Sequence, residues 1–179
     1  MTVETTPIAA ETPKLWDGAA FIEDSWTRAV GPSDAKDGAR LILPLDVFLA
    51  LDETAIGSGR FAPEVQPGEA IEPLLPHLAR LPLIVLAFPA YNDGRSYSKA
   101  ELLRSRHGYH GAIRASGDVL VDQIPHMIRV GFSQLEVKNP VAQRRLEDGT
   151  LTGFALHYQP AAKPSETSGG YSWRRKPAA

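Results

Sequence analysis

The chain has 179 residues, with 19 Lys plus Arg against 21 Asp plus Glu and a formal net charge of -2. This balance disfavours nonspecific binding to nucleic acid or to an acidic membrane surface. Because the chain has no cysteine, it cannot form a disulfide, a thiolate metal site or an iron–sulfur cluster. We therefore predict no intrinsic cofactor, and any redox chemistry would need a cofactor that the chain does not itself provide.

Both ends of the chain are predicted to be disordered. Residues 1–13 are rich in Thr, Pro and Glu, and residues 160–179 are rich in Pro, Ser and Gly. The N-terminal segment lacks the basic start and apolar centre of a signal peptide, and no apolar run is long enough to cross a bilayer. We expect a single cytoplasmic domain over residues 14–159, followed by a flexible tail.

Hydrophobic patterning predicts alternating strands and helices. Residues 15–26 place Asp17 and Gly18 between two apolar segments, which is typical of a β-hairpin. Two pairs of a strand and a helix follow, and their expected ranges are 41–43 with 44–52 and 61–65 with 70–81.

A continuous run of Leu, Ile and Val over residues 83–88 predicts a strand that is covered on both faces. The next helix is expected over residues 99–107. Ser98 and Glu101 have the spacing of a capping box, and Gly108 is expected to end the helix.

The C-terminal part continues the alternation. Asp118 is a preferred cap for a helix that ends at Gly131, but Pro125 lacks an N–H group and predicts either a kink or a later start. Asn139 followed by proline predicts the start of another helix. The remaining strands are expected at residues 111–115, 134–138 and 154–158.

Repeated βα units with short connections require parallel strand pairing. We therefore predict an α/β fold with a mostly parallel sheet of about five or six strands and a short N-terminal β-hairpin. The alternative is an incomplete (β/α) barrel. In both architectures ligands bind beyond the carboxyl ends of the strands, so the loops after residues 43, 88, 115 and 138 should share one functional edge.

Several motifs lie within residues 88–123, and some of their residues belong to this edge. They are Phe88-Pro-Ala-Tyr-Asn-Asp-Gly-Arg-Ser-Tyr-Ser, Leu102-Leu-Arg, Gly108-Tyr-His-Gly, Ile113-Arg-Ala-Ser-Gly-Asp-Val-Leu and Asp122-Gln. Over residues 81–136 the chain resembles a bacterial family of unknown function that is associated with assimilatory sulfite reduction and is commonly labelled as oxidoreductases. The resemblance implies sulfite reductase or its electron donor as a partner.

A small anion is the ligand that the basic and hydroxyl side chains at this edge predict. Arg95 lies at a helix start, where free N–H groups favour an anion, but it could instead pair with Asp93. Arg114 either faces the site or pairs with an acidic residue such as Asp118 or Asp122. The candidate residues for anion binding are Arg95, Ser98, Arg114, Ser116 and Gly117.

The candidates for catalysis are Asp93 or Asp118 as the acid–base group and Tyr97 as the polarising group. Each has a structural alternative, because Asp118 can cap a helix and Tyr97 can be a half-buried anchor. The supporting residues are Arg104, Tyr109, Asp122 and Gln123. We predict no metal site, since the five histidines have no familiar ligand spacing.

Three functions remain open. The first is an accessory protein of sulfite reduction that binds a small anion or a reductase partner at the carboxyl edge of the strands. The second is an enzyme that acts on a small anionic substrate. The third is a structural subunit without a ligand site.

Overall fold

The computed structural model describes residues 13–34, 38–90 and 92–150. The strands of this part are β1 (Lys14–Trp16), β2 (Phe21–Ile22), β3 (Trp26–Arg28), β4 (Arg40–Pro44), β5 (Phe61–Val65), β6 (Leu83–Phe88), β7 (Ala112–Gly117) and β8 (Gln134–Val137). The helices are η1 (Pro32–Asp34), α1 (Leu45–Leu49), α2 (Glu53–Gly57), η2 (Glu72–Arg80), α3 (Arg95–Ser105), α4 (Ile124–Val130) and α5 (Pro140–Glu147). The expected strand 154–158, the tail 160–179 and all but the last residue of segment 1–13 lie outside the described residues.

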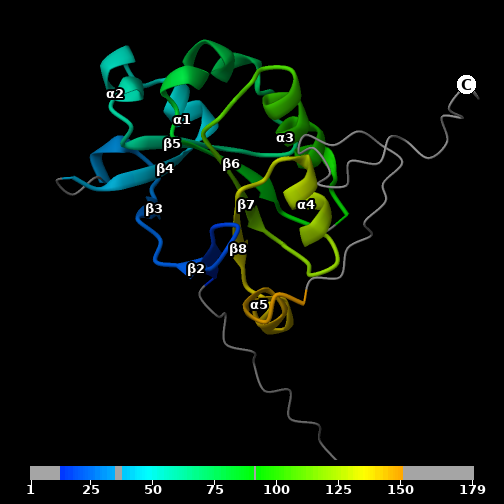
Figure 1. Ribbon diagram of the computed structural model, residues 1–179. Helices are drawn as coiled ribbons and strands as arrows, with labels where there is room; N and C mark the ends of the chain where they lie inside the picture. Colours follow the sequence, from blue (N-terminus) through cyan, green and yellow to red (C-terminus); the bar gives the residue numbers. More distant parts are fainter. Residues whose placement is uncertain (1–12, 35–37, 91, 151–179) are drawn as a thin grey trace, which may run out of the picture.

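All eight strands form one sheet in the order β2-β1-β8-β7-β6-β5-β4-β3. The six strands from β3 to β8 are parallel neighbours in chain order, and β1 pairs antiparallel with both β8 and β2. The predicted α/β fold with an N-terminal hairpin is therefore confirmed, and the six parallel strands agree with the predicted five or six. Because consecutive right-handed crossovers between sequential strands put their helices on one side, the sheet has one helical face and one open face (Figure 1).

The sheet must curl, because its two edge strands are joined by a very short link. Only three residues separate Ile22 at the end of β2 from Trp26 at the start of β3, and that length of chain spans at most about 14 Å. In a flat sheet of eight strands the two edges would lie about 34 Å apart. The structure is thus a half-barrel, in agreement with the predicted alternative, and β2 and β3 lie near each other in Figure 1.

The two faces of the half-barrel differ in chemistry. The helical face carries the main apolar core, which includes Phe48, Phe88 and Phe132. A small second cluster of Ile42, Ala62, Leu83 and Val85 lies on the concave face. Nearer the carboxyl ends of the strands, this concave face becomes polar, since Glu64, Ser116 and Glu136 are each the penultimate residue of their strand.

Two predicted elements match the structure closely. The continuous apolar run forms β6, in which all six residues are buried. Asn139 caps α5 by accepting hydrogen bonds from the N–H groups of Val141 and Ala142 at 2.8 and 3.2 Å. In both cases the signal is local, because burial on two faces and a capped first turn depend on neighbouring residues in the chain.

The predicted capping box at Ser98 is wrong, because α3 begins at Arg95 with Gly94 as its N-cap. The buried hydroxyl of Ser96 donates to the carbonyl of Ala87 at 2.7 Å. This bond fastens the first turn of the helix to the end of β6, so the helix starts one turn earlier than its local capping signal indicates. Ser98 is exposed within the helix.

Asp118 does not cap a helix, and this prediction is also wrong. Helix α4 starts at Ile124, with Pro125 in its first turn and Gln123 as its N-cap. The expected later start is confirmed, since proline fits the first helical turn, where an N–H group is not needed. Gly131 ends the helix with a positive φ of 112°, as expected for a C-cap glycine.

The two earlier helices are shorter or tighter than predicted. The range 44–52 contains only α1, and Asp52 caps the separate helix α2 through the N–H group of Ala55 at 2.8 Å. The range 70–81 contains the 3-10 helix η2, which has a proline in its interior. That proline removes a backbone donor and favours the tighter winding over an α-helix.

Candidate functional site

The carboxyl edge of the sheet brings together two turns that the order of elements predicts to meet there. Phe88, the last residue of β6, pairs with Gly117, the last residue of β7. The N–H group of Asp118 donates to the carbonyl of Phe88 at 2.7 Å. The Asp-Gly-Arg turn after β6 and the Ser-Gly-Asp turn at the end of β7 therefore lie on the same rim, as predicted.

Arg95 on this rim is paired with Asp93. Its Nε and Nη2 atoms donate to the two carboxylate oxygens at 2.9 and 2.7 Å. The hydrogen bond from Arg95 lowers the pKa of Asp93 below its ordinary value. The structure thus shows the ion pair that was the alternative to an anion clamp, and the charge of Arg95 is already balanced.

We expect Arg95→Gln to raise the pKa of Asp93 toward that of a free carboxylate, since its main stabilising partner is removed. A depressed carboxylate pKa adds stability above the ordinary pKa, and this stability is lost as the pH falls through the lowered value. A pH titration of the Asp93 carboxyl carbon by NMR in both proteins measures the shift. An unchanged pKa in the variant would contradict the pairing.

The other rim candidates do not converge on a single point. Ser98, Asp118 and Asp122 are exposed. Tyr97 packs between Phe88 and His126, with ring centroids 5.0 and 4.7 Å away. Burial, followed by the charge of Asp122, raises the pKa of Tyr97 to about 12. Tyr97 is thus the half-buried anchor of the structural interpretation, and its catalytic role stays a prediction.

Arg114 lies inside the half-barrel and not on its rim. Its side chain is 0% exposed, and two of its nitrogens donate to the Asp24 carboxylate at 2.8 and 3.0 Å. Nε donates to Gln134 at 3.0 Å, and Glu136 lies 3.4 Å from Nη1. The predicted ion pair exists, but its acidic partners are Asp24, in the link between β2 and β3, and Glu136 of β8, and not Asp118 or Asp122.

A second arginine joins this interior network from the opposite edge of the sheet. Arg28 of β3 donates through Nη2 to Glu64 of β5 and to Glu136 of β8, both at 2.9 Å. Ser116 donates to Glu64 at 2.8 Å across the intervening strand. Burial lowers the pKa of Arg28, but its bonds to the two carboxylates outweigh burial and raise that pKa above its ordinary value. Ion pairs therefore bridge the interior of the half-barrel.

Sequence reasoning missed five members of this network. They are Asp24, Arg28, Glu64, Gln134 and Glu136. A signal was available for the glutamates, because a charged residue between apolar neighbours in a predicted buried strand is unusual. No local sequence signal indicated which charged residues pair with each other, since Arg28 and Glu136 meet only when the sheet curls.

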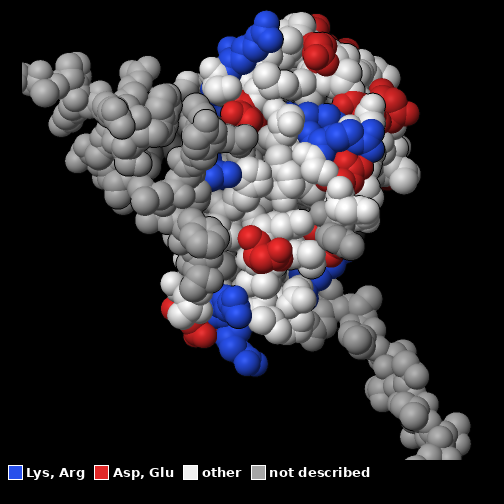
Figure 2. Space-filling model, turned by 90° about the vertical axis from the view of Figure 1, so that its right-hand side faces the viewer, with Lys and Arg blue, Asp and Glu red and all other residues white. Residues whose placement is uncertain are grey.

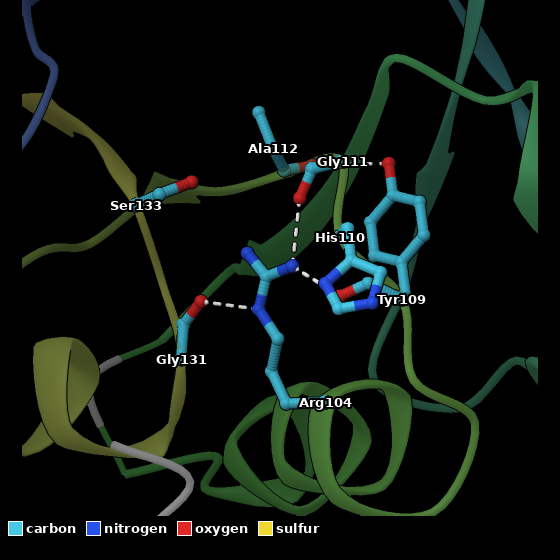
Figure 3. A pocket seen from close by; sticks show the side chains of 7 residues that line it. All are labelled: Arg104, Tyr109, His110, Gly111, Ala112, Gly131 and Ser133. Atoms are coloured by element: carbon cyan, nitrogen blue, oxygen red, sulfur yellow. Dashed lines mark hydrogen bonds between the residues drawn. The ribbon is translucent and has the colours of Figure 1, made fainter. Parts of the chain in front are cut away.

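An open pocket of about 500 Å³ lies at the opposite, amino end of β7 and β8 (Figure 3). Arg104 of α3 reaches into its wall, where Nε donates to the carbonyl of Gly131 at 3.0 Å and Nη1 to that of Gly111 at 2.7 Å. Nη1 also donates to the carbonyl of Tyr109. The two supporting residues Arg104 and Tyr109 thus belong to a separate site from the rim.

The described surface gives no sign of a larger charged interface on the face drawn in Figure 2, where acidic and basic side chains lie interspersed. Within the described ranges, no three potential metal ligands lie close enough to hold an ion. Nor does that part of the chain contain a helix with the length and apolar character of a membrane span. The interior network and the amino-end pocket are therefore the sites to compare.

Comparison with known proteins adds one finding. A family model described as "Bacterial protein of unknown function (DUF934)" matches residues 64–168, a range that includes β6, β7, β8 and the helices between them. No curated protein and no solved structure gives a significant match.

Proposed function

The chain belongs to this bacterial family of unknown function, and on that premise we propose that it is an accessory binding protein of assimilatory sulfite reduction. Its ligand is a small polar molecule at the carboxyl mouth of the half-barrel. We use this name for the end of the interior at the carboxyl ends of the strands, beside Glu64, Ser116 and Glu136. The pathway rests on the sequence resemblance, and the location rests on the interior network.

The observation that carries the proposal is the charge inside the barrel. The interior of a (β/α) barrel is ordinarily filled by branched apolar side chains. Buried ion pairs add little net stability compared with apolar packing, so well-packed apolar side chains in place of the whole network would hold the sheet together equally well. Departures from packing rules of this kind concentrate at functional sites, and this one lies where such folds bind ligands.

The charge balance specifies the ligand. The network has three carboxylates, of Asp24, Glu64 and Glu136, and two guanidinium groups. The Arg28 side chain is 44% exposed, and its Nη1 donates no hydrogen bond within the described residues. A bare anion would meet excess negative charge, so the ligand that fits has an anionic group for Arg28 and a hydrogen-bond donor for the carboxylates.

Thermal melting of the full chain tests the proposal with sulfite, sulfate, phosphate and the zwitterionic amino acids serine and cysteine. A ligand at a hundred times its dissociation constant adds about 2.7 kcal/mol to the free energy of unfolding. We expect a zwitterion to raise the Tm of the wild type and Arg28→Gln to abolish the increase. Arg95→Gln is the matched control, because that arginine is exposed and its side chain is bonded to Asp93 on the rim. No shift with either zwitterion, or an equal zwitterion-induced shift in the wild type and in Arg28→Gln, would refute this function.

An enzyme at the same mouth is the second candidate, and the contact between Ser116 and Glu64 favours it. A carboxylate that accepts a hydrogen bond from a hydroxyl at 2.8 Å is suitably placed to take its proton. In that case Ser116→Ala would retain ligand binding but lose turnover of the bound compound. Binding without turnover in the wild type would leave the accessory role.

A further inference from the structure

We propose that the pocket at the amino end of β7 is a second binding site, in which Arg104 takes a small oxyanion group. The site lies at the opposite end of the strands from the carboxyl mouth. It does not depend on the function proposed above.

Arg104 is a half-buried cation whose protein acceptors are all neutral. Its three hydrogen bonds go to the backbone carbonyls of Tyr109, Gly111 and Gly131. In the described part of the chain Arg104 forms no salt bridge, whereas Arg28, Arg80, Arg95 and Arg114 each contact a carboxylate. Besides these carbonyls, the guanidinium group contacts the ring of Tyr109, 5.5 Å from its centroid. Within the described residues, no carboxylate therefore balances the positive charge of Arg104.

The structural role of Arg104 accounts for only part of its guanidinium group. The Nε and Nη1 atoms fasten two chain segments together, as Figure 3 shows. Nη2 carries two further N–H donors and makes no hydrogen bond within the described residues. A guanidinium group fixed on one side and unused on the other is a preorganised donor for an anionic oxygen.

Other residues that line the pocket add further hydrogen-bond donors. Ser133 lines the pocket and accepts a hydrogen bond from the N–H group of Ile113 at 3.2 Å, which leaves its hydroxyl proton to donate. His110 is exposed on the wall, and its ring offers a further N–H donor. Arginine, serine and histidine together form a donor set of the kind that binds sulfate, phosphate or carboxylate.

Two glycines allow the chain segments that line the pocket to approach each other closely. A Cβ atom on Gly111 would lie 2.3 Å from the hydroxyl oxygen of Tyr109 and 2.6 Å from the carbonyl oxygen of Leu81. A Cβ atom on Gly131 would lie 2.4 Å from Cγ of Arg104. Only glycine permits these close contacts without a shift of the neighbouring atoms. The three hydrogen bonds to backbone carbonyls then hold the guanidinium group in position before any ligand arrives, which lowers the entropic cost of binding.

The pocket has room for an oxyanion that is one end of a larger molecule. A volume of about 500 Å³ falls within the range of small-molecule sites and leaves space beyond an inorganic anion. Free sulfate or phosphate and an organic molecule with a carboxylate or phosphate group share the chemistry that Arg104 recognises. The experiment therefore includes inorganic and organic probes.

Isothermal titration calorimetry of the full chain tests the site with sulfate, phosphate, acetate and glycerol phosphate, at constant ionic strength in a chloride buffer. We expect binding of at least one oxyanion, with a tenfold or greater loss of affinity in Arg104→Gln. Arg106→Gln is the matched control, since Arg106 is exposed at the end of the same helix. Arg28→Gln should also bind the oxyanion normally, which separates this site from the carboxyl mouth.

Because Arg104 also fastens the fold, a second variant keeps the test decisive if Arg104→Gln does not fold. Ser133→Ala combined with His110→Ala leaves all three bonds of Arg104 to the backbone in place and is expected to weaken oxyanion binding at least threefold. Absence of any binding above chloride, or equal affinity in the wild type and the double variant, would overturn the proposal. Tighter binding of glycerol phosphate than of inorganic phosphate would identify an organic ligand, and the reverse order would identify a free anion.

Discussion

Replacing Arg114 with methionine is expected to lower the free energy of unfolding by about 3–5 kcal/mol, the usual loss when one partner of a buried ion pair is removed. The Arg114 side chain is fully buried, and Glu136, which is 6% exposed, lies beside it. The substitution leaves the carboxylates of Asp24 and Glu136 without this counter-charge. Urea unfolding at pH 7, followed by tryptophan fluorescence, measures the change.

Two comparisons identify the cause of this loss. Arg80→Met breaks the exposed pair with Glu53 and should cost much less, because exposed ion pairs are screened by solvent. Adding Asp24→Asn to Arg114→Met removes the carboxylate that has lost its guanidinium partner, so the double variant should recover part of the stability. If Arg114→Met cost no more than Arg80→Met, the interior network would be only weakly coupled to folding.

Gly117→Ala is expected to destabilise the protein by about 3 kcal/mol, through backbone strain and a steric clash. The φ angle of Gly117 is 94°, and a Cβ atom there would lie 2.3 Å from the carbonyl oxygen of Phe88. That oxygen belongs to the backbone of the neighbouring strand, so the clash cannot be relieved by rotating a side chain. The carboxyl ends of β6 and β7 would have to separate.

Gly59→Ala provides the control that separates strain from clash. Gly59 also has a positive φ, of 71°, but among the described residues no atom lies within 4 Å of the position that a Cβ atom would take. Its substitution should therefore cost only the strain of the backbone angle, about 1–2 kcal/mol. Chemical denaturation of the two variants gives the difference. Equal losses would show that β6 and β7 are not tightly apposed at Phe88.

The candidate site was only partly predictable from sequence. The rim follows from the order of elements, because parallel strands deliver their carboxyl ends to one edge, and Phe88 and Gly117 meet there. For Arg95 the sequence left two alternatives open, an anion clamp and an ion pair with Asp93, and the structure shows the ion pair. The partners of Arg114 were predicted wrongly, since acidic residues nearby in the chain were favoured, whereas Asp24 lies 90 positions away.

The first residues of α5 and α3 also show how far local sequence signals predict the structure. Asn139 caps α5 because its own side chain satisfies the N–H groups of the next turn. Ser98 has an equally good local signal, but the bond from Ser96 to Ala87 decides where α3 begins. A contact between two elements thus outweighs a capping preference of about 1 kcal/mol.

The alternation of strands and helices, the parallel pairing and the edge at which the loops gather follow from the amino-acid pattern, because they depend on local periodicity and short connections. The meeting of Arg28 and Glu136 across the interior of the half-barrel and the pocket beside Arg104 at the other end of the strands do not follow from that pattern. Curvature and the partners of buried charges are set by the packing of the whole sheet, in which residues far apart in the chain come within bonding distance.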